Sequence, residues 1–194
     1  MADFFFSAPA GTHAHRKEDQ MLKQLNPSEL VISPFDILDK SWALLVAGVE
    51  HPNPMTVSWG GFGTLWNKPV VTLYVRPTRY TWQLLEEHPE FTLNVMPARF
   101  HGALNYCGSH SGRHINKWEK AGLTPQESTT IAVPRVAGAA LSFECRTLAF
   151  QDFDPGRFLQ PGVEGNYPQK DYHRIYWGET LAIWIDDAFT PGQE

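Results

Sequence analysis

Two long segments in the second half of the chain alternate apolar and polar side chains, and this period of two constrains the fold more than any other feature. The first is A-A-L-S-F-E-C-R-T-L-A-F, residues 139–150. Its two faces carry Leu141, Phe143 and Cys145 on one side and Ser142, Glu144 and Arg146 on the other. The alternation predicts an antiparallel strand with one buried face.

The second segment, residues 172–185, repeats this pattern near the end of the chain. One common side carries His173, Ile175, Trp177, Leu181, Ile183 and Ile185. We therefore expect a second half-buried strand, with a histidine on its apolar side. Most such histidines are satisfied core residues, although one near a pocket could hydrogen-bond a ligand or donate a proton to it.

Shorter segments complete the expected architecture. Strand-like runs occupy residues 41–49, 55–59, 70–75 and 91–95, and helical patterns occupy 78–87, 101–107 and 112–121. These elements predict a mainly β (α+β) protein, a barrel or closed sheet with inserted helices. Residues 1–28 lack a clear period and are interpreted as a tail or arm. Residues 29–194 are expected to form one domain, since a chain of 194 residues with 42% hydrophobic content can bury one good core.

The charge and the apolar runs exclude several classes of partner. The formal net charge is −5 and no basic run is present, which argues against nucleic acid and anionic membrane surfaces as partners. No apolar run is long enough to span a bilayer, and Phe4-Phe5-Phe6 follows Asp3 rather than a basic segment, so a cytoplasmic protein is expected. Cys107 and Cys145 are expected to be reduced, and no metal site is predicted.

The segment V-R-P-T-R-Y-T places two arginines at the start of the predicted helix 78–87. A helix N-terminus carries partial positive charge and unpaired N–H groups, so bases are unfavourable there unless an anion binds. Arg76, Arg79 and a capping threonine, Thr78 or Thr81, could together hold a phosphate. The alternative is that both arginines point to solvent or pair with surface acids.

A second segment, C-G-S-H-S-G-R-H-I-N-K at residues 107–117, repeats this arrangement. Arg113 falls in the first turn of the helix predicted at 112–121, and Lys117 follows four residues later on the same face. Ser109 and Ser111 could serve only as helix caps. Two such segments in one small domain nevertheless favour a phosphorylated ligand.

A third segment, N-P-M-T-V-S-W-G-G-F-G-T-L-W at residues 53–66, contains the predicted strand 55–59 and the glycines that follow it. Thr56 and Ser58 could hydrogen-bond the edge of a polar ring, and Trp59 and Trp66 could form its walls. The alternative is a glycine-marked bend at a barrel corner with both tryptophans in the core. Composition alone favours that alternative.

The chain carries these motifs in order: N-P-M-T-V-S-W-G-G-F-G-T-L-W, V-T-L-Y-V-R-P-T-R-Y-T, F-T-L-N-V, C-G-S-H-S-G-R, A-G-L-T-P, F-E-C-R-T-L and D-Y-H-R-I-Y-W-G-E-T. In these motifs it resembles the flavin reductase-like family with the FMN-binding split barrel, and its flavoredoxin-like branch in particular. The resemblance covers about residues 30–185. It implies a homodimer of Greek-key split β-barrels, with FMN bound non-covalently near the dimer interface.

The resemblance also implies the residues of the cofactor site. Met55, Thr56, Val57 and Ser58 would line the isoalloxazine, beside Trp59. The phosphate end would be held by Arg76, Arg79, Tyr80 and Thr81, together with Ser109, Ser111, Gly112, Arg113 and Lys117. His173 would help position a nicotinamide. The family usually has an acid after S-G-R, where this chain has His114.

The resemblance thus implies an FMN-dependent oxidoreductase that passes electrons from NAD(P)H to a small-molecule or protein acceptor. One alternative is a flavoredoxin-type electron carrier that does not use nicotinamide directly. Another is a binding module for a different ligand, such as haem or a sugar phosphate.

Overall fold

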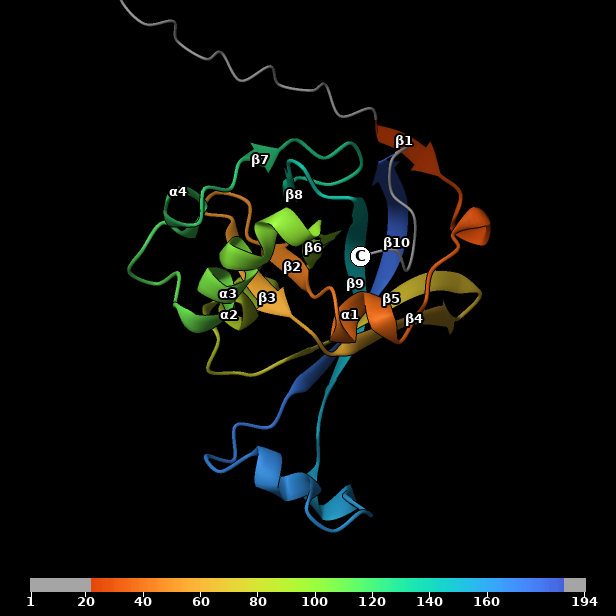
Figure 1. The fold of residues 1–194 in the computed structure, drawn as a ribbon. Coiled ribbons are helices and arrows are strands. Elements are labelled where there is room, and N and C mark those ends of the chain that lie inside the picture. Colours follow the sequence, from red (N-terminus) through yellow and green to blue (C-terminus); the bar gives the residue numbers. More distant parts are fainter. Residues whose placement is uncertain (1–21, 187–194) are drawn as a thin grey trace, which may run out of the picture.

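The computed structural model describes residues 22–186, which form one curled antiparallel sheet with helices on its outside (Figure 1). The strands are β1 (Leu22–Leu25), β2 (Ala43–Ala47), β3 (Asn53–Val57), β4 (Gly60–Leu65), β5 (Lys68–Val75), β6 (Glu90–Val95), β9 (Leu141–Asp152) and β10 (Arg174–Asp186). A separate two-stranded ladder pairs β7 (Pro125–Gln126) with β8 (Arg135–Val136). The helices are α1 (Asp36–Asp39), α2 (Tyr80–Glu87), α3 (His101–Ser109) and α4 (Lys117–Lys120), and 3-10 turns lie at Pro27–Glu29, Ala98–Phe100, Pro155–Arg157 and Val163–Asn166.

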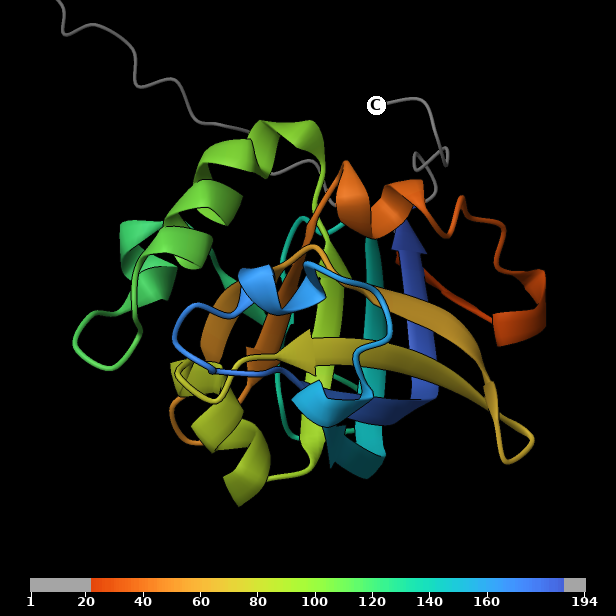
Figure 2. The same cartoon turned by 90° about the horizontal axis from the view of Figure 1, so that it is seen from below.

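The order of the strands explains why the sheet curls. The path runs β3-β2-β6-β9-β10-β5-β4, with β1 attached to β10. Its two end strands, β3 and β4, are separated in the chain by Ser58 and Trp59 alone. The two edges of the sheet must therefore come together at this dipeptide, which we call the seam. Figure 2 shows the resulting barrel from the side on which the 153–173 segment lies.

The expectation of a mainly β protein with inserted helices is confirmed. The strands expected from the short runs are found within a few residues of their predicted bounds. The sequence analysis missed β4, because its glycine-rich run G-G-F-G-T-L does not alternate. β4 forms a hairpin with β5 across Trp66 and Asn67, which both have positive φ as the tight turn requires.

Strand β2 separates two apolar clusters. Its alternate residues Leu45 and Ala47 face the barrel interior with Leu93 and Phe143. The residues between them, such as Leu44, face a second cluster under α3. Both faces of this strand are therefore buried, as its continuous apolar run allows.

The expected half-buried strand at 139–150 is wrong for the first part of β9. Ser142 is 2% exposed and Glu144 is 0% exposed, so the polar face is buried as well. The segment 127–136 covers this face and supplies its hydrogen bonds, such as Thr130 N to Glu144 Oε2 at 2.8 Å. Polar side chains can be buried only where another segment supplies their hydrogen bonds. The alternation of residues along one strand does not show whether such a segment is present.

The predicted common side of the last strand is also wrong. The pairing of β9 with β10 shifts register twice, and the shifts skip Leu148 of β9 and Leu181 of β10. The bulge at Leu181 changes which face the following residues of β10 occupy, so Tyr176 and Ile183 both enter the barrel core although their spacing is odd. His173 lies just before the strand and is buried there.

Two of the three expected helices are confirmed as α2 and α3. The third does not begin at residue 112. Asn116 takes an extended backbone and its side chain accepts from Trp118 N and Glu119 N, so α4 starts only at Lys117. Residues 111–116 form an irregular loop against the start of α2.

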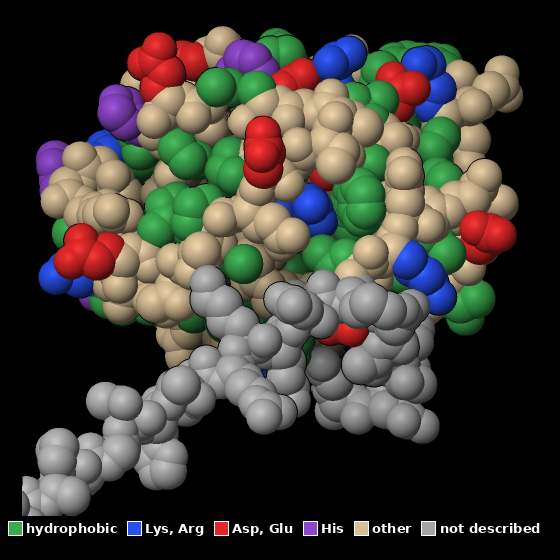
Figure 3. Space-filling model, turned by 90° about the horizontal axis from the view of Figure 1, so that it is seen from above, with side chains coloured by type: hydrophobic (Ala, Val, Ile, Leu, Met, Phe, Trp, Pro, Cys, Tyr) green, Lys and Arg blue, Asp and Glu red, His purple; other side chains and the backbone are tan. Residues whose placement is uncertain are grey.

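Several peripheral features complete the fold. Residues 22–25 of the expected tail form β1, while residues 1–21 lie outside the described part of the chain. Residues 153–173 form a long connection between β9 and β10 that lies across one end of the barrel (Figure 2). On the opposite side, Figure 3 shows acidic and basic side chains interspersed among the coloured residues. No helix within residues 22–186 is both long and apolar enough to cross a membrane.

Candidate cofactor site at the seam

A cavity of about 240 Å³ lies at the seam of the sheet. Eight residues from β3, the seam, β5 and the chain that follows β5 line it, together with one histidine: Met55, Thr56, Val57, Ser58, Trp59, Tyr74, Arg76, Arg79 and His173. We call it the ring cavity. All of its lining residues except Tyr74 are among the predicted site residues.

A smaller pocket of about 90 Å³ adjoins the ring cavity and shares Met55 and Arg79 with it. We call it the polar pocket. Its other lining residues come from β3, the start of α2 and the loop before α4: Asn53, Thr78, Tyr80, Thr81, His110, Ser111, Gly112, Arg113 and Lys117. The fold thus joins the two segments that the sequence analysis assigned to a phosphate.

The start of α2 offers backbone donors to this pocket. Arg79 is its N-cap residue, with φ −77° and ψ 141°, and no side chain caps the helix. The expectation that Thr78 or Thr81 caps it is wrong, because Thr81 Oγ1 instead accepts from Asn53 Nδ2 at 2.8 Å. The first N–H groups of an eight-residue helix are therefore left for another acceptor.

The loop before α4 closes the other side of the polar pocket. Arg113 donates to the carbonyl of Thr78 at 3.1 Å, and its guanidinium lies over the Tyr80 ring at 5.7 Å. Gly112 packs directly on Asn53, so closely that a Cβ atom would overlap Oδ1 of that residue. Glycine is needed here for close approach, and the same contact brings Arg113 to the helix start.

Lys117 places a positive charge at the base of the polar pocket. The residue is 4% exposed, and Nζ donates to the carbonyls of Cys107 at 2.8 Å and Pro54 at 3.1 Å. Both partners are neutral. Burial is the main cause that lowers the pKa of Lys117 to about 8, with Arg79 adding to the effect. An anion in this pocket would relieve the cost of burying that charge.

Two of the predicted phosphate-end residues lie elsewhere. Arg76 lines the ring cavity rather than the polar pocket, and its guanidinium is bound to Asp171 Oδ1 at 2.8 Å and to the carbonyl of Asn166 at 2.9 Å. Ser109 lines neither cavity, because its hydroxyl donates back to the carbonyl of Asn105 within α3. Arg79, by contrast, lines both cavities and makes one long hydrogen bond, 3.4 Å, to the carbonyl of Gly108.

His173 lies at the far end of the ring cavity. Burial, with the nearby charge of Arg76, lowers the pKa of this histidine to about 4, so the ring is neutral at physiological pH. Its Nδ1 atom shares a hydrogen bond of 2.9 Å with the hydroxyl of Tyr167. With the hydroxyl as donor, the ring proton resides on Nε2 and is available to a ligand. The ring lies 5.2 Å from that of Trp59.

The sequence analysis missed two residues that shape the site. Tyr74 lines the ring cavity, and its position near the end of β5, two residues before Arg76, was a signal for it. Asn53 lines the polar pocket and holds Thr81 in place. It stands at the start of the 53–66 motif, directly after a proline, where its residue type is equally typical of a turn.

A curled antiparallel sheet whose two edges meet at a seam, with two adjoining cavities there, defines a split-barrel protein. The chain belongs to the family described as the flavin reductase like domain, whose model matches residues 41–192. The family assignment agrees with the resemblance on which the site residues were predicted.

Solved structures of similar fold agree with this assignment. The FMN-binding domain of a flavin reductase-like enzyme from Shewanella baltica superposes with a TM-score of 0.63 at 18% identity, covering 87% of this chain and 78% of that one. Flavoredoxin of Desulfovibrio vulgaris gives 0.60 at 17% identity, covering 85% and 78%. The NADH:FAD oxidoreductase SgcE6 of Streptomyces globisporus gives 0.57 at 20% identity, covering 74% of each chain. At these identities the likeness shows the split-barrel fold.

Proposed function

We propose that this protein binds FMN and passes electrons from NAD(P)H through the flavin to an acceptor. One observation carries the proposal: a cavity of about 240 Å³ adjoins a polar pocket that holds Arg79, Arg113 and the buried Lys117. A planar ring joined to a phosphate needs these two environments side by side. The family and the fold support the same ligand.

The residues at each end fit the parts of FMN. Thr56 and Ser58 bring polar atoms to the ring cavity, and Trp59, 47% exposed, provides a flat apolar wall. The start of α2 and the three cations match a phosphate dianion. FMN would supply the redox chemistry, while these residues bind it, orient its ring and exclude water.

Arg79 provides the first test of the proposal. We expect Arg79→Ala to weaken FMN binding by at least tenfold while riboflavin binding changes less than threefold, since riboflavin lacks the phosphate. Arg99→Ala is a matched control, because Arg99 also makes a single 3.4 Å hydrogen bond to a glycine carbonyl but lies outside both cavities. Fluorescence titration with each flavin measures the effect. Equal losses for the two flavins would assign Arg79 a structural role only.

The choice of electron donor separates two candidate functions. A flavin reductase uses NAD(P)H directly, whereas a flavoredoxin-type carrier exchanges electrons with protein partners, and both kinds of protein share this fold. We favour the reductase because neutral, buried His173 lies in the ring cavity, where its Nε2 proton can be donated to a nicotinamide amide. Anaerobic mixing of the flavin-loaded protein with NADH or NADPH tests this. A flavin that is bleached by neither nucleotide would favour the carrier.

We also propose that the protein acts as a homodimer in the cytoplasm. Large apolar side chains on the described surface support self-association, among them Trp66 at 64% and Leu159 at 96% exposed. Light scattering of the full chain, with and without FMN, gives its mass directly. A monomer under both conditions would overturn the dimer.

A further inference from the structure

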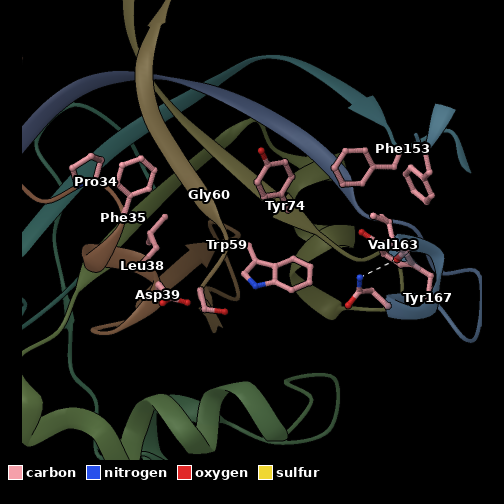
Figure 4. A pocket seen from close by; sticks show the side chains of 13 residues that line it. Pro34, Phe35, Leu38, Asp39, Trp59, Gly60, Tyr74, Phe153, Val163 and Tyr167 are labelled. Carbon is pink, nitrogen blue, oxygen red and sulfur yellow. Dashed lines mark hydrogen bonds between the residues drawn. The ribbon is translucent and has the colours of Figure 1, made fainter. Parts of the chain in front are cut away.

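A second, larger cavity lies beside the ring cavity and is not explained by FMN binding. It measures about 520 Å³ and is bounded on one side by α1 and the chain before it, and on the other by the 153–173 connection. Aromatic and aliphatic side chains make up most of its lining, among them Phe35, Trp59, Tyr74, Phe153, Phe158 and Tyr167. Figure 4 shows the Trp59 indole projecting between these two sides. We call it the aromatic cavity.

The aromatic cavity adjoins the ring cavity. Ser58, Trp59 and Tyr74 line both. These residues form the seam and the adjoining part of β5, so a molecule in the aromatic cavity lies next to whatever occupies the ring cavity. The position is one from which electrons could pass directly between two ligands.

The rings of the lining are held in place by one another. Tyr74 and Phe153 stack at 5.7 Å with 17° between their planes, and Phe158 and Tyr167 stack at 6.1 Å with 21° between theirs. Phe153 and Phe158 meet edge to face at 6.1 Å, which joins the two pairs. Walls of this kind match flat aromatic molecules, which gain from offset stacking and edge contacts.

The charged groups of the cavity favour a neutral ligand over an anion. Asp39 is the one ionisable acid or base of the lining apart from tyrosine. The guanidinium of Arg76 lies 4.9 Å over the ring of the lining residue Tyr167, but it is already bound to Asp171 and the carbonyl of Asn166. A phosphate, sulfonate or carboxylate here would meet an acid and no free cation among the lining residues. The polar pocket, with its three cations, is the opposite environment.

We propose that the aromatic cavity binds an uncharged, planar aromatic molecule of the quinone class, which accepts electrons from the flavin. The electron transfer rests on the proposed function, whereas the binding does not. In the balanced reaction, the reduced flavin loses two electrons and two protons and the quinone gains them to become a hydroquinone. The acceptor is thus a small neutral ring rather than a free flavin phosphate or an anionic metal complex.

Calorimetry tests the binding with a matched pair of ligands. We expect 2-methyl-1,4-naphthoquinone to bind at least tenfold tighter than 1,4-naphthoquinone-2-sulfonate, which has a similar ring system and one negative charge. Val163→Trp fills the cavity from the 153–173 connection and should weaken binding of the neutral quinone at least tenfold. Val31→Trp, on an exposed residue outside the lining, is the control. Thermal unfolding confirms that both variants fold.

A redox measurement tests the same cavity in the flavin-loaded protein. After anaerobic reduction with dithionite, Val163→Trp should slow reoxidation by the neutral quinone at least tenfold and leave reoxidation by ferricyanide unchanged. Equal binding of the two naphthoquinones, or no effect of Val163→Trp in a folded variant, would overturn the proposal. Quinone binding that appears only on dilution to monomers would also overturn it, because a second copy of the chain would then fill the cavity.

The two proposals can fail separately. A protein that binds FMN but no quinone refutes the aromatic site and leaves the proposed function standing. A protein that takes up no FMN refutes the proposed function, while calorimetry on the flavin-free protein still measures quinone binding.

Discussion

Two buried charges in this protein have opposite surroundings. Glu144 is fully buried and accepts hydrogen bonds from the backbone and hydroxyl groups of Thr129 and Thr130 and from the Trp184 indole, while Arg135 lies 3.2 Å away as an ion pair. Lys117 is nearly as buried, yet its hydrogen-bond partners within residues 22–186 are two carbonyls and none is a carboxylate.

The comparison distinguishes a buried charge that stabilises the fold from a buried charge that can bind a ligand. Around Glu144 every favourable position is taken by the protein itself, so the carboxylate fixes the 127–136 segment to the sheet. Lys117 keeps a charge that no described acid neutralises, and that charge faces a cavity. A buried charge left open toward a pocket is where an oppositely charged ligand gains most.

The largest effect on stability should come from a change at Glu144, which is surrounded by hydrogen bonds and by Arg135. Glu144→Gln leaves Arg135 without its buried anion and removes charge from the hydrogen bonds, so we expect a loss of about 3 to 4 kcal/mol in the free energy of unfolding. Urea denaturation measures it. Glu119→Gln, on the exposed side of α4, should change stability by less than about 0.5 kcal/mol. A loss below about 1 kcal/mol for Glu144→Gln would mean that the network is not structural.

Removal of the Lys117 charge should affect FMN binding more than it affects the stability of the fold. We expect Lys117→Met to weaken FMN binding by about 100-fold, close to 2.7 kcal/mol, because a charge-assisted contact to the phosphate is lost in a buried site. Riboflavin binding should change less than threefold. Lys120→Met, in the same helix but exposed, is the control. If FMN and riboflavin lose affinity equally, Lys117 supports the pocket without contacting phosphate.

The pH dependence of FMN binding gives the smallest and most specific effect. The pKa of Lys117 is lowered to about 8, so the ammonium is charged below that pH and becomes neutral above it. The phosphate is already a dianion above pH 7. Affinity for FMN should therefore hold up to about pH 8 and fall up to tenfold from pH 8 to 9. Riboflavin should show no such fall, and neither should Lys117→Met with FMN; a fall in either would assign the titration to another group.

The order of the motifs predicted the fold and most of the ring cavity, because β3 and the seam supply consecutive residues. The polar pocket was predicted for a partly wrong reason. Arg113 and Lys117 were placed on one helix face, whereas the loop from Ser111 to Asn116 is irregular and reaches the pocket through the contact between Gly112 and Asn53. A contact between positions so far apart in the chain leaves no periodic signal.

The remaining errors have a similar cause. The pairing of Arg76 with Asp171 joins two segments almost a hundred residues apart, so a local pattern of charges could not distinguish it from a phosphate contact. Likewise, the hydrogen bonds of Glu144 come from a segment with no strong strand or helix pattern of its own. The periodicity of a segment predicts which of its own faces is apolar. It cannot predict the partners of Arg76 and Glu144, because those partners come from other segments.

The seam also bears on the stability of the flavin-free protein. Within the described chain, the sheet path ends at β3, whose outer edge pairs with no other strand and is covered by α3, where Gly108 packs on Thr56. A flavin in the ring cavity would add contacts to both β3 and the end of β5, two strands that the seam brings together. The flavin-free chain would lack these contacts, so it should unfold at a lower temperature than the flavin-loaded protein. Flavin supply would in this way set how much of the protein persists, as well as how much is active.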